Sequence, residues 1–465
     1  MRIADLADRR VAVWGYGREG RAALAALHVQ LPALRPTLFC SPGEARIARH
    51  VEDVWGASTH QPTSALDIVT TPPDAAMLAA FEVVIKSPGI SAYKPELTAA
   101  QEHGTQFVSG TTLWFAEHPS ARVIAVTGTK GKSTVSALIA HLLRGLGKRV
   151  ALAGNIGLPL LELLDPPQQP DWWVVELSSF QTREAVGVEV AVINNVYEEH
   201  LDWHGTRARY VEDKLALAAV ARTLVVNGAQ PALLELVHAH PRQLAFAQSA
   251  GWHVTDGKIL RGAEVVFDLS ASPLPGAHNA NNLCAALAAL EAAGEDARTA
   301  ARTIAHFHPL PHRLQMLGER EGLYWIDDSI ATTPQATLEA LASLAGRAVS
   351  VLLGGFDRGL DWQPFASQVC AQPPHAIITM GASGPRIAAQ LRAAGGAYRL
   401  EETTGVDAAV ACARTLTPAG GVVLLSPGAP SFDQFKDYTQ RGRHFAELAG
   451  FDPEAIGVIE GLGIA

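Results

Sequence analysis

A glycine- and lysine-rich turn between an apolar strand and a helix constrains the fold of this chain more than any other segment. Residues 123–126 have the composition of a buried strand, and Gly128-Thr-Lys-Gly-Lys132-Ser133-Thr134 follows them. Glycines let backbone N–H groups approach phosphate oxygens, and the start of the helix expected from Ser133 favours anions. In such a loop Lys132 would reach the β- and γ-phosphates while Ser133 ligates Mg²⁺. The segment therefore predicts an α/β unit that binds a nucleoside triphosphate.

This loop departs from the usual phosphate-binding pattern at one position. The usual pattern requires glycine at position 126, where this chain has Val126. The departure points away from ordinary nucleotide triphosphatases and toward a shorter loop variety. A glycine-rich turn without a ligand is the alternative interpretation.

Apolar runs elsewhere repeat the alternation of strand and helix and predict three α/β units. The predicted strands are residues 11–14, 37–40 and 83–85, then 123–126, 172–177, 191–195 and 224–227, then 324–327, 349–353 and 422–425. A new unit begins near residue 112, and His308-Pro-Leu-Pro-His312 separates the second unit from the third. We therefore expect a Rossmann-like domain over residues 1–112, a central P-loop-type domain over 113–311 and a second Rossmann-like domain over 312–465, in agreement with about 150 residues per domain.

Composition narrows the range of partners and compartments. Hydrophobic residues make up 48% of the chain, and the formal charge is −9 without a long basic run, which argues against nucleic acid or an anionic membrane as the main partner. No apolar run approaches the ~18 residues that a membrane span needs, and the first residues resemble no signal peptide. The four cysteines, Cys40, Cys284, Cys370 and Cys412, lie far apart, so we expect reduced thiols and a cytoplasmic location.

A second glycine pattern, Gly15-x-Gly17-x-x-Gly20, follows the first predicted strand. An NAD site would require an acidic residue at the end of the next strand, where this chain has Phe39-Cys40-Ser41. The pattern favours another nucleotide held by its phosphates, while NAD and a turn without a ligand remain alternatives.

Acidic and imidazole side chains follow two strands of the second unit. Glu176 and Ser178 lie at the end of the strand 172–177, where a carboxylate can complete the coordination of Mg-ATP, although a serine that caps a helix is the alternative. Glu198-Glu199-His200 follows the strand 191–195, and ligands gather at this edge of open α/β sheets. Taken alone, His200 would more often be structural than a metal ligand.

Three further segments are ambiguous when taken singly. Lys214 by composition is an ordinary solvated lysine. Asn279 and Asn282 at a helix start would supply amides to a nucleotide or merely cap the helix. Asp327-Asp328-Ser329 and Ser426-Pro-Gly-Ala-Pro-Ser431-Phe-Asp433 each end a strand of the third unit and therefore lie on its ligand-binding edge.

In this order across three units, these segments resemble those of the Mur ligases. The ending Ser426-Pro…Ser431-Phe-Asp-Gln-Phe…Arg441-Gly442 resembles the branch that adds glutamate to UDP-N-acetylmuramoyl-alanine. The resemblance covers nearly the whole chain. Folylpolyglutamate synthetases share the phosphate loop but are not expected to carry this ending.

The resemblance implies an ATP-dependent, amide-forming enzyme that works through an acyl phosphate, with two Mg²⁺ ions, UDP-N-acetylmuramoyl-L-alanine and glutamate as substrates, and a monomeric state. It implies that Lys132, Glu176, His200 and Lys214 are catalytic, and that Ser133, Glu176, His200 and a carbamylated Lys214 hold metal. ATP contacts are implied at Gly128, Thr129, Lys130, Gly131, Lys132, Ser133, Thr134, Asn279, Asn282, Arg313 and Asp328. Substrate contacts are implied at Gly15, Gly17, Ser87, Gly89, Asn155, Ser178, Thr332, Arg358, Ser431 and Tyr438.

The departures from the family pattern lie where glutamate is received. Enzymes that add D-glutamate commonly read Asp-Ser-Lys-Ala-Thr-Asn, whereas this chain has Ile330 and Thr333 in place of the lysine and the asparagine, and Tyr438 where phenylalanine is common. Opposite stereoisomers demand different donor positions, so these changes favour the variant that adds L-glutamate. The alternatives are the same reaction with D-glutamate and an ATPase or switch protein that forms no amide. Arg18 and Glu19 inside the first glycine turn also depart from the pattern.

Overall fold

The computed structural model describes residues 1–49, 66–197, 201–357, 359–457, 459 and 461–465. The chain divides into two compact units. Unit 1 comprises Met1–Ser272, His278–Phe307 and Gly461–Ala465, and unit 2 comprises Pro273–Ala277 and His308–Glu460. Both units contain mainly parallel sheets accompanied by helices, so the predicted α/β class is confirmed.

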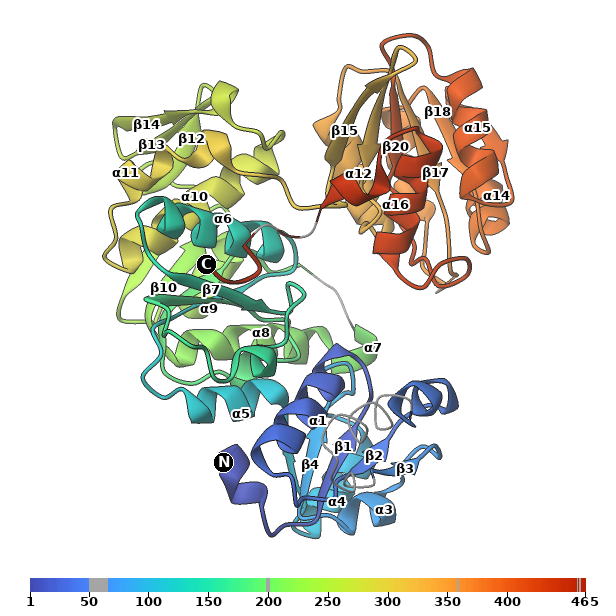
Figure 1. Ribbon diagram of the computed structural model, residues 1–465. Coiled ribbons are helices and arrows are strands. Elements are labelled where there is room, and N and C mark those ends of the chain that lie inside the picture. The colour runs from blue at the N-terminus through green and yellow to red at the C-terminus, as the bar shows by residue number, and fades with distance from the viewer. Residues whose placement is uncertain (50–65, 198–200, 358, 458, 460) are drawn as a thin grey trace. The chain divides into compact units, whose positions relative to one another are not determined.

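The amino-terminal part of unit 1 is a parallel sheet whose described strands follow the order β3-β2-β1-β4-β5. The strands are β1 Val11–Trp14, β2 Thr37–Phe39, β3 Asp67–Val69, β4 Val83–Lys86 and β5 Gln106–Val108. The accompanying helices are η1 Ile3–Leu6, α1 Arg18–Gln30, α3 Ala75–Ala79, α4 Pro95–Glu102 and α5 Gly110–Glu117 (Figure 1). The strand order reverses at β1, and ligands of such sheets bind at the strand ends beside the reversal.

The central part of unit 1 is a larger sheet in the order β11-β10-β9-β6-β8-β7-β21 over the described residues. Its strands are β6 Val123–Thr127, β7 Val150–Gly154, β8 Trp172–Glu176, β9 Val188–Ile193, β10 Ala221–Asn227, β11 Gln243–Phe246 and β21 Gly463–Ile464. The helices are α6 Lys132–Gly145, η2 Leu160–Leu163, η3 Thr182–Glu184, α7 Leu201–His204, α8 Arg207–Ala219, α9 Pro231–Val237, α10 Ala277–Ala292, α11 Ala297–Ala301 and η5 Ile304–His306. Because β6 is parallel to both β8 and β9, the segments that follow these three strands meet at one edge of the sheet.

Residues 461–465 return to this sheet after the chain has passed through unit 2. Strand β21 pairs antiparallel with β7, placing Gly463 opposite Leu152 and Ile464 opposite Ala151. The Arg144 guanidinium donates to the carbonyl oxygens of Gly461 at 2.7 Å and Val150 at 2.8 Å. The edge of β7 is therefore covered by a segment distant in sequence.

A small antiparallel sheet also belongs to unit 1. It consists of β12 Trp252–Thr255, β13 Lys258–Arg261 and β14 Glu264–Asp268, followed by η4 Leu269–Ala271. Asp256 and Gly257, which join the first two strands, both have positive φ, as a tight type I′ hairpin requires.

Unit 2 is built on one mixed sheet in the order β15-β16-β20-β17-β18-β19. The strands are β15 Gln315–Arg320, β16 Leu323–Asp327, β17 Val349–Leu353, β18 Ala376–Thr379, β19 Arg399–Glu402 and β20 Val422–Leu425, and only β15 runs antiparallel to its neighbour within the described part. The helices are α12 Pro334–Ser343, α13 Gln363–Ala371, α14 Gly384–Ala394, α15 Val406–Leu416, α16 Tyr438–Leu448 and η6 Pro453–Ile456. The segments after β16 and β20 end side by side, because these parallel strands are neighbours.

All strands predicted from apolar runs are found, with small shifts of their limits. The strand expected to end at residue 195 ends at Ile193, so Asn194 and Asn195 lie beyond it and face the loop after β6. The domain limits at residues 112 and 311 stay predictions. No helix among the described residues is long and apolar enough to cross a membrane.

Candidate active site

The turn between β6 and α6 takes the shape of an anion-binding loop because glycine occupies its sharpest bend. Gly131 caps α6 with φ +77°, a conformation that side chains rarely adopt. A Cβ atom at this position would lie 2.5 Å from side-chain atoms of Asn194 and Asn282. The Lys132 ammonium donates to the Thr129 carbonyl at 3.0 Å, so the lysine folds back over its own loop. Any side chain at position 131 would collide with these asparagines, so the turn depends on glycine.

Asparagine side chains from neighbouring strand ends hold this loop. The side-chain amides of Asn194 and Asn195 each donate to the Lys130 carbonyl at 3.0 Å, and Asn195 Oδ1 accepts from the Lys130 N–H at 2.8 Å. Asn194 also donates to the Asn282 side chain at 2.9 Å, and Asn282 donates to Asn279 at 3.2 Å. The predicted Asn282 therefore reaches the phosphate loop from α10, and the predicted Asn279 is hydrogen-bonded to it.

Glu176 ends β8 beside the same loop and is 1% exposed. Its Oε1 accepts from the Asn155 amide at 2.8 Å, which brings these two predicted residues together. Its Oε2 is buried and has no hydrogen-bond partner within the described part of the chain. Leaving a buried carboxylate oxygen unsatisfied is costly, so this atom is available to a cation.

Lys214 lies on α8 and is not the solvated lysine that composition suggests, because it is 2% exposed. Its ammonium donates to the carbonyl of Gly128 at 2.9 Å and lies 4.9 Å from the centre of the Tyr210 ring. The Tyr210 hydroxyl is 2.6 Å from Thr129 Oγ1. Helix α8 thus brings Lys214 to the first residue of the phosphate loop.

The amino-terminal glycine turn follows β1 at the strand-order reversal. Gly15 has φ +95°, and a Cβ on it would meet Ser87 Oγ at 2.7 Å, while a Cβ on Gly20 would meet the Gly15 carbonyl at 1.9 Å. The Ser87 hydroxyl donates to that same carbonyl at 3.3 Å. The structure therefore brings the predicted Gly15, Gly17, Ser87 and Gly89 to neighbouring strand ends, and Arg18 donates to the Gly157 carbonyl at 3.1 Å.

Two half-buried acids, Glu19 and Glu184, lie close to this glycine turn. Burial, together with Glu184 and Glu162, raises the pKa of Glu19 to about 7, and burial likewise raises the pKa of Glu184 to about 7. Ser109 donates to Glu184 at 2.5 Å. Oxygen Oε2 of Glu19 would lie 3.1 Å from a Cβ atom on Gly110, so this side chain points toward α5.

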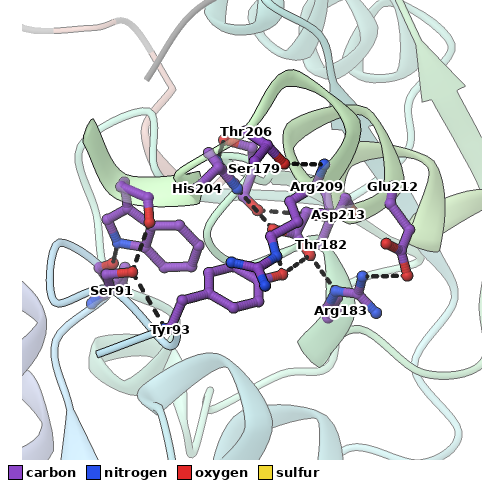
Figure 2. A network of polar contacts seen from close by, with 12 residues as sticks. Ser91, Tyr93, Ser179, Thr182, Arg183, His204, Thr206, Arg209, Glu212 and Asp213 are labelled. Atoms are coloured by element: carbon purple, nitrogen blue, oxygen red, sulfur yellow. Dashed lines mark hydrogen bonds and ion pairs between the residues drawn. The ribbon is translucent and has the colours of Figure 1, made fainter. Parts of the chain in front are cut away.

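A network of polar and aromatic side chains connects the segment after β4 of the five-stranded sheet with α8 and the loop after β8 of the seven-stranded sheet (Figure 2). The Asp213 carboxylate accepts from the Tyr93 hydroxyl at 2.7 Å, lies 2.6 Å from His204 Nδ1 and is ion-paired with Arg183. Nε2 of His204 is 3.0 Å from Ser179 Oγ, next to the predicted Ser178. Burial and the Asp213 carboxylate raise the pKa of Tyr93 to about 12, so its hydroxyl stays protonated and donates.

In unit 2, the predicted Asp328 is buried at the end of β16. It accepts from Ser426 Oγ at 2.7 Å and from the Leu314 N–H at 3.2 Å. Burial raises the pKa of this carboxyl to about 7, and Asp327 adds to the effect, while these hydrogen bonds and Arg313 oppose it.

This shift predicts a pH dependence of stability. The folded pKa lies above the ordinary value of 3.8, so the contribution of Asp328 is complete below that value and is lost as pH rises toward 7. The Asp328→Asn variant has no ionisable group at this position, so it should be spared a decrease of up to about 4 kcal/mol in the free energy of unfolding as pH rises. Urea unfolding near pH 5 and near pH 8 should therefore show a smaller pH dependence in the variant than in the unsubstituted chain. Equal slopes in the two proteins would contradict the assignment.

The wall expected to receive glutamate is held together by a buried arginine. Arg441 is 1% exposed and donates to Ser329 Oγ at 3.0 Å, to the Ser329 carbonyl at 2.8 Å and to the Ala429 carbonyl at 3.0 Å. Ser329 Oγ in turn donates to the Tyr438 carbonyl at 2.8 Å. The predicted Thr332, Ser431 and Tyr438 thus lie on segments that Arg441 and Ser329 join.

Gly442 explains how α16 approaches β16 so closely. A Cβ at Gly442 would lie 2.2 Å from His312 Nδ1 and 2.5 Å from Asp327 Oδ2. His312 Nδ1 is 2.6 Å from that same Asp327 oxygen. Glycine at position 442 is therefore required by packing at this strand end.

Two predicted residues, His200 and Arg358, lie outside the described residues. Sequence reasoning missed the roles of Asn194, Asn195, Asp213, His312 and Arg441 in holding the site. The two asparagines carried a usable signal, since they follow an apolar strand at the edge where ligands gather. The other three act through contacts distant in sequence that no local pattern reports.

The chain is similar to known proteins over its whole length. Residues 126–290 match the Mur ligase middle domain, and residues 312–428 match the Mur ligase glutamate ligase domain. A UDP-N-acetylmuramoyl-L-alanine--L-glutamate ligase of Xanthomonas euvesicatoria is 50% identical and covers 100% of both chains. A protein of the same name from Micromonospora is 40% identical, over 96% of this chain and 98% of its own.

Solved structures agree on the fold. A UDP-N-acetylmuramate-alanine ligase from Thermotoga maritima superposes with a TM-score of 0.60 at 18% identity, covering 95% of this chain and 99% of its own. A MurF ligase from the same organism, in complex with ADP, gives 0.59 at 16% identity and covers 97% and 100%.

Proposed function

Because this chain belongs to the Mur ligase family, we propose that it joins L-glutamate to UDP-N-acetylmuramoyl-L-alanine at the cost of ATP, in peptidoglycan precursor synthesis. The enzyme is an amide-bond-forming ligase. The observation that carries the proposal is the convergence of the phosphate loop, Glu176 and the Asn194–Asn282 pair at one sheet edge. Relatives named for L-glutamate at 50% and 40% identity support the choice of amino acid.

The chemistry requires activation because an amine does not attack a carboxylate at a useful rate. Transfer of the γ-phosphoryl group of ATP to an alanyl carboxylate oxygen gives an acyl phosphate and ADP. The glutamate amine then attacks the carbonyl carbon and loses a proton, the bond from carbon to the phosphate oxygen breaks, and phosphate leaves. Lys132 and the N–H groups of residues 131–134, at the start of α6, would neutralise phosphate charge during transfer.

The residues present fit Mg²⁺, which prefers oxygen ligands. The buried Oε2 of Glu176 accepts no hydrogen bond from any described residue, and Ser133 lies in the first turn of α6, so these two residues would hold one ion. Bound there, the metal would neutralise crowded phosphate oxygens. Within the described ranges no three His, Cys, Asp or Glu side chains gather, so phosphate oxygens and water would complete the coordination. A second ion would depend on carbamylated Lys214 and on His200.

We assign the three predicted domains to the three substrates. Residues 1–112 would bind the UDP substrate through Gly15, Gly17, Ser87 and Gly89, with Asn155 and Ser178 completing that site. Residues 113–311 would bind ATP through the phosphate loop, Asn279 and Asn282, and Arg313 and Asp328 would add contacts from the third domain. Residues 312–465 would receive glutamate through Thr332, Arg358, Ser431 and Tyr438. We further propose that the protein is a monomer, which gel filtration tests, and that it works in the cytoplasm, which cell fractionation tests.

The choice between the two glutamate isomers is the first test. Purified protein with Mg-ATP and UDP-N-acetylmuramoyl-L-alanine should form amide product with L-glutamate at least about a hundredfold faster than with D-glutamate, because misplaced carboxylates leave polar groups unpaired. Product mass and phosphate release are followed together. Product with D-glutamate alone would contradict the isomer assignment and keep the ligase reaction. Phosphate release independent of both glutamate and the nucleotide-sugar would contradict ligation itself.

A further inference from the structure

The segment after β4 is attached to the central part of unit 1 by Trp203. This segment begins with Ser87, whose hydroxyl touches the glycine turn after β1. The indole N–H of Trp203 donates to the Pro88 carbonyl at 3.0 Å, and the Ser91 hydroxyl donates to the Trp203 carbonyl at 2.6 Å. Trp203 is thus hydrogen-bonded to this segment on both sides of its turn.

The same tryptophan rests on the loop that follows Glu176. The Trp203 ring stacks on Phe180 with ring centres 4.6 Å apart and an interplanar angle of 24°, and it meets the Tyr93 ring edge-on at 5.7 Å. Trp203 is 8% exposed, so the contact is shielded from water. The strand end that carries Glu176 and the segment that carries Ser87 therefore share one aromatic contact.

Asp213, on α8, adds a third set of contacts to this junction between the segment Ser87–Tyr93 and the central part of unit 1. Its carboxylate is 2% exposed and receives the Tyr93 hydroxyl, Nδ1 of His204 and the Arg183 guanidinium (Figure 2). Because a carboxylate accepts, His204 donates through Nδ1, which leaves Nε2 facing Ser179. The next residue on α8 is Lys214, which touches the phosphate loop. Asp213 consequently links Tyr93 to the helix that supports that loop.

We propose that Tyr93, Trp203, His204 and Asp213 are positioning residues for ligation, which fix the segment Ser87–Tyr93 relative to the loop Ser178–Gln181 and to α8. They touch no reacting atom. By the proposed function, the nucleotide-sugar is held by residues on the first sheet while its alanyl carboxylate must reach phosphate at the second. A displacement of about 1 Å at such a junction costs on the order of a hundredfold in rate. The proposal rests on the proposed function.

Tyr93→Phe is the sharpest test because it removes one hydroxyl and keeps the ring that packs against Trp203. Losing a hydrogen bond to a buried carboxylate should lower kcat/KM for UDP-N-acetylmuramoyl-L-alanine roughly tenfold to a hundredfold. The KM for ATP should stay within about twofold, since the phosphate loop is untouched. A lowered melting temperature with unchanged kcat/KM for the nucleotide-sugar would overturn the proposal, because the hydroxyl would then contribute only to stability.

Tyr398→Phe is the matched control. The Tyr398 hydroxyl donates to the Leu391 carbonyl at 3.1 Å within unit 2, and its loss should leave both KM values unchanged. The Tyr93→Phe/Asp213→Asn pair adds a second test. If Tyr93 acts through Asp213, its substitution should have little further effect on kcat/KM in the Asp213→Asn background. Full additivity of the two effects would overturn the link.

Hydrogen exchange separates failure of this proposal from failure of the proposed function. Backbone amides of residues 87–93 and 178–181 should exchange faster in Tyr93→Phe than in the unsubstituted chain and in Tyr398→Phe, whether or not the protein ligates glutamate. Unchanged exchange would overturn the fixed junction even in an active ligase. Faster exchange in a protein without ligase activity would support the junction and overturn only the proposed function.

Discussion

Ligation by the Glu176→Gln variant is expected to fall about a thousandfold, because the substitution removes the charge that would hold Mg²⁺. The buried Oε2 of Glu176 has no hydrogen-bond partner among the residues that the structure describes, so it is suited to bind a cation. Glutamine keeps the shape and can still accept from Asn155 through its carbonyl oxygen. Removing an unsatisfied buried charge should also leave the melting temperature equal or higher, which distinguishes lost chemistry from unfolding.

Steady-state rates over a range of Mg²⁺ concentrations measure this effect. Glu295→Gln is the matched control, since Glu295 accepts from Trp172 at 2.9 Å, at the opposite end of the same strand β8. The control should keep its activity within about threefold. Retention of activity by Glu176→Gln, with an unchanged Mg²⁺ requirement, would remove Glu176 from the metal site.

The Lys214→Ala variant is expected to lose at least about a hundredfold in rate and to recover part of it when short carboxylic acids are added. A carbamate forms when the neutral amine attacks carbon dioxide and releases a proton, which creates a new carboxylate on Nζ. Lys214 is buried against the Gly128 carbonyl and the Tyr210 ring, where truncation leaves a cavity that formate or acetate can enter.

Rescue is measured as product formed with and without acetate at constant ionic strength. Lys148→Ala serves as the control, because Lys148 pairs with Glu295 at 3.0 Å and should show neither loss nor rescue. Acetate should not restore product formation in Glu176→Gln either, because the glutamine side chain leaves no cavity for it. An inactive Lys214→Ala variant that no carboxylate restores would mark Lys214 as a structural lysine.

The parallel sheets could be predicted from the sequence because their strands are continuous apolar runs. Strand β6 and strand β17 are buried along their whole length, so every position favours an apolar residue and the signal is strong. The phosphate loop and Glu176 could be predicted for a related reason, since strand ends of such sheets gather ligands.

The small sheet β12-β13-β14 was missed because its strands are short and half exposed. The polar residues of Lys258–Arg261 and Glu264–Asp268 mask any apolar run. The Asp256-Gly257 pair did carry a hairpin signal, as its positive φ angles confirm.

Contacts that join distant segments could not be predicted from local pattern. Tyr93 and Asp213 are separated by 120 residues, and their hydrogen bond depends on two sheets packing together. The buried state of Lys214 likewise comes from tertiary packing, which overrides its composition. Site residues of this kind are defined only by the folded structure.

The pairing of β21 with β7 has a consequence for the order in which the chain folds. Arg144 and Ala465 are in contact across 321 residues of sequence, so β7 stays an open edge until all of unit 2 has left the ribosome. An open edge presents unpaired N–H and C=O groups to other nascent chains, and closing so long a loop is slow. Residues 461–465 therefore pair with β7 late in folding, and this pairing protects the edge of the sheet from association with a neighbouring chain.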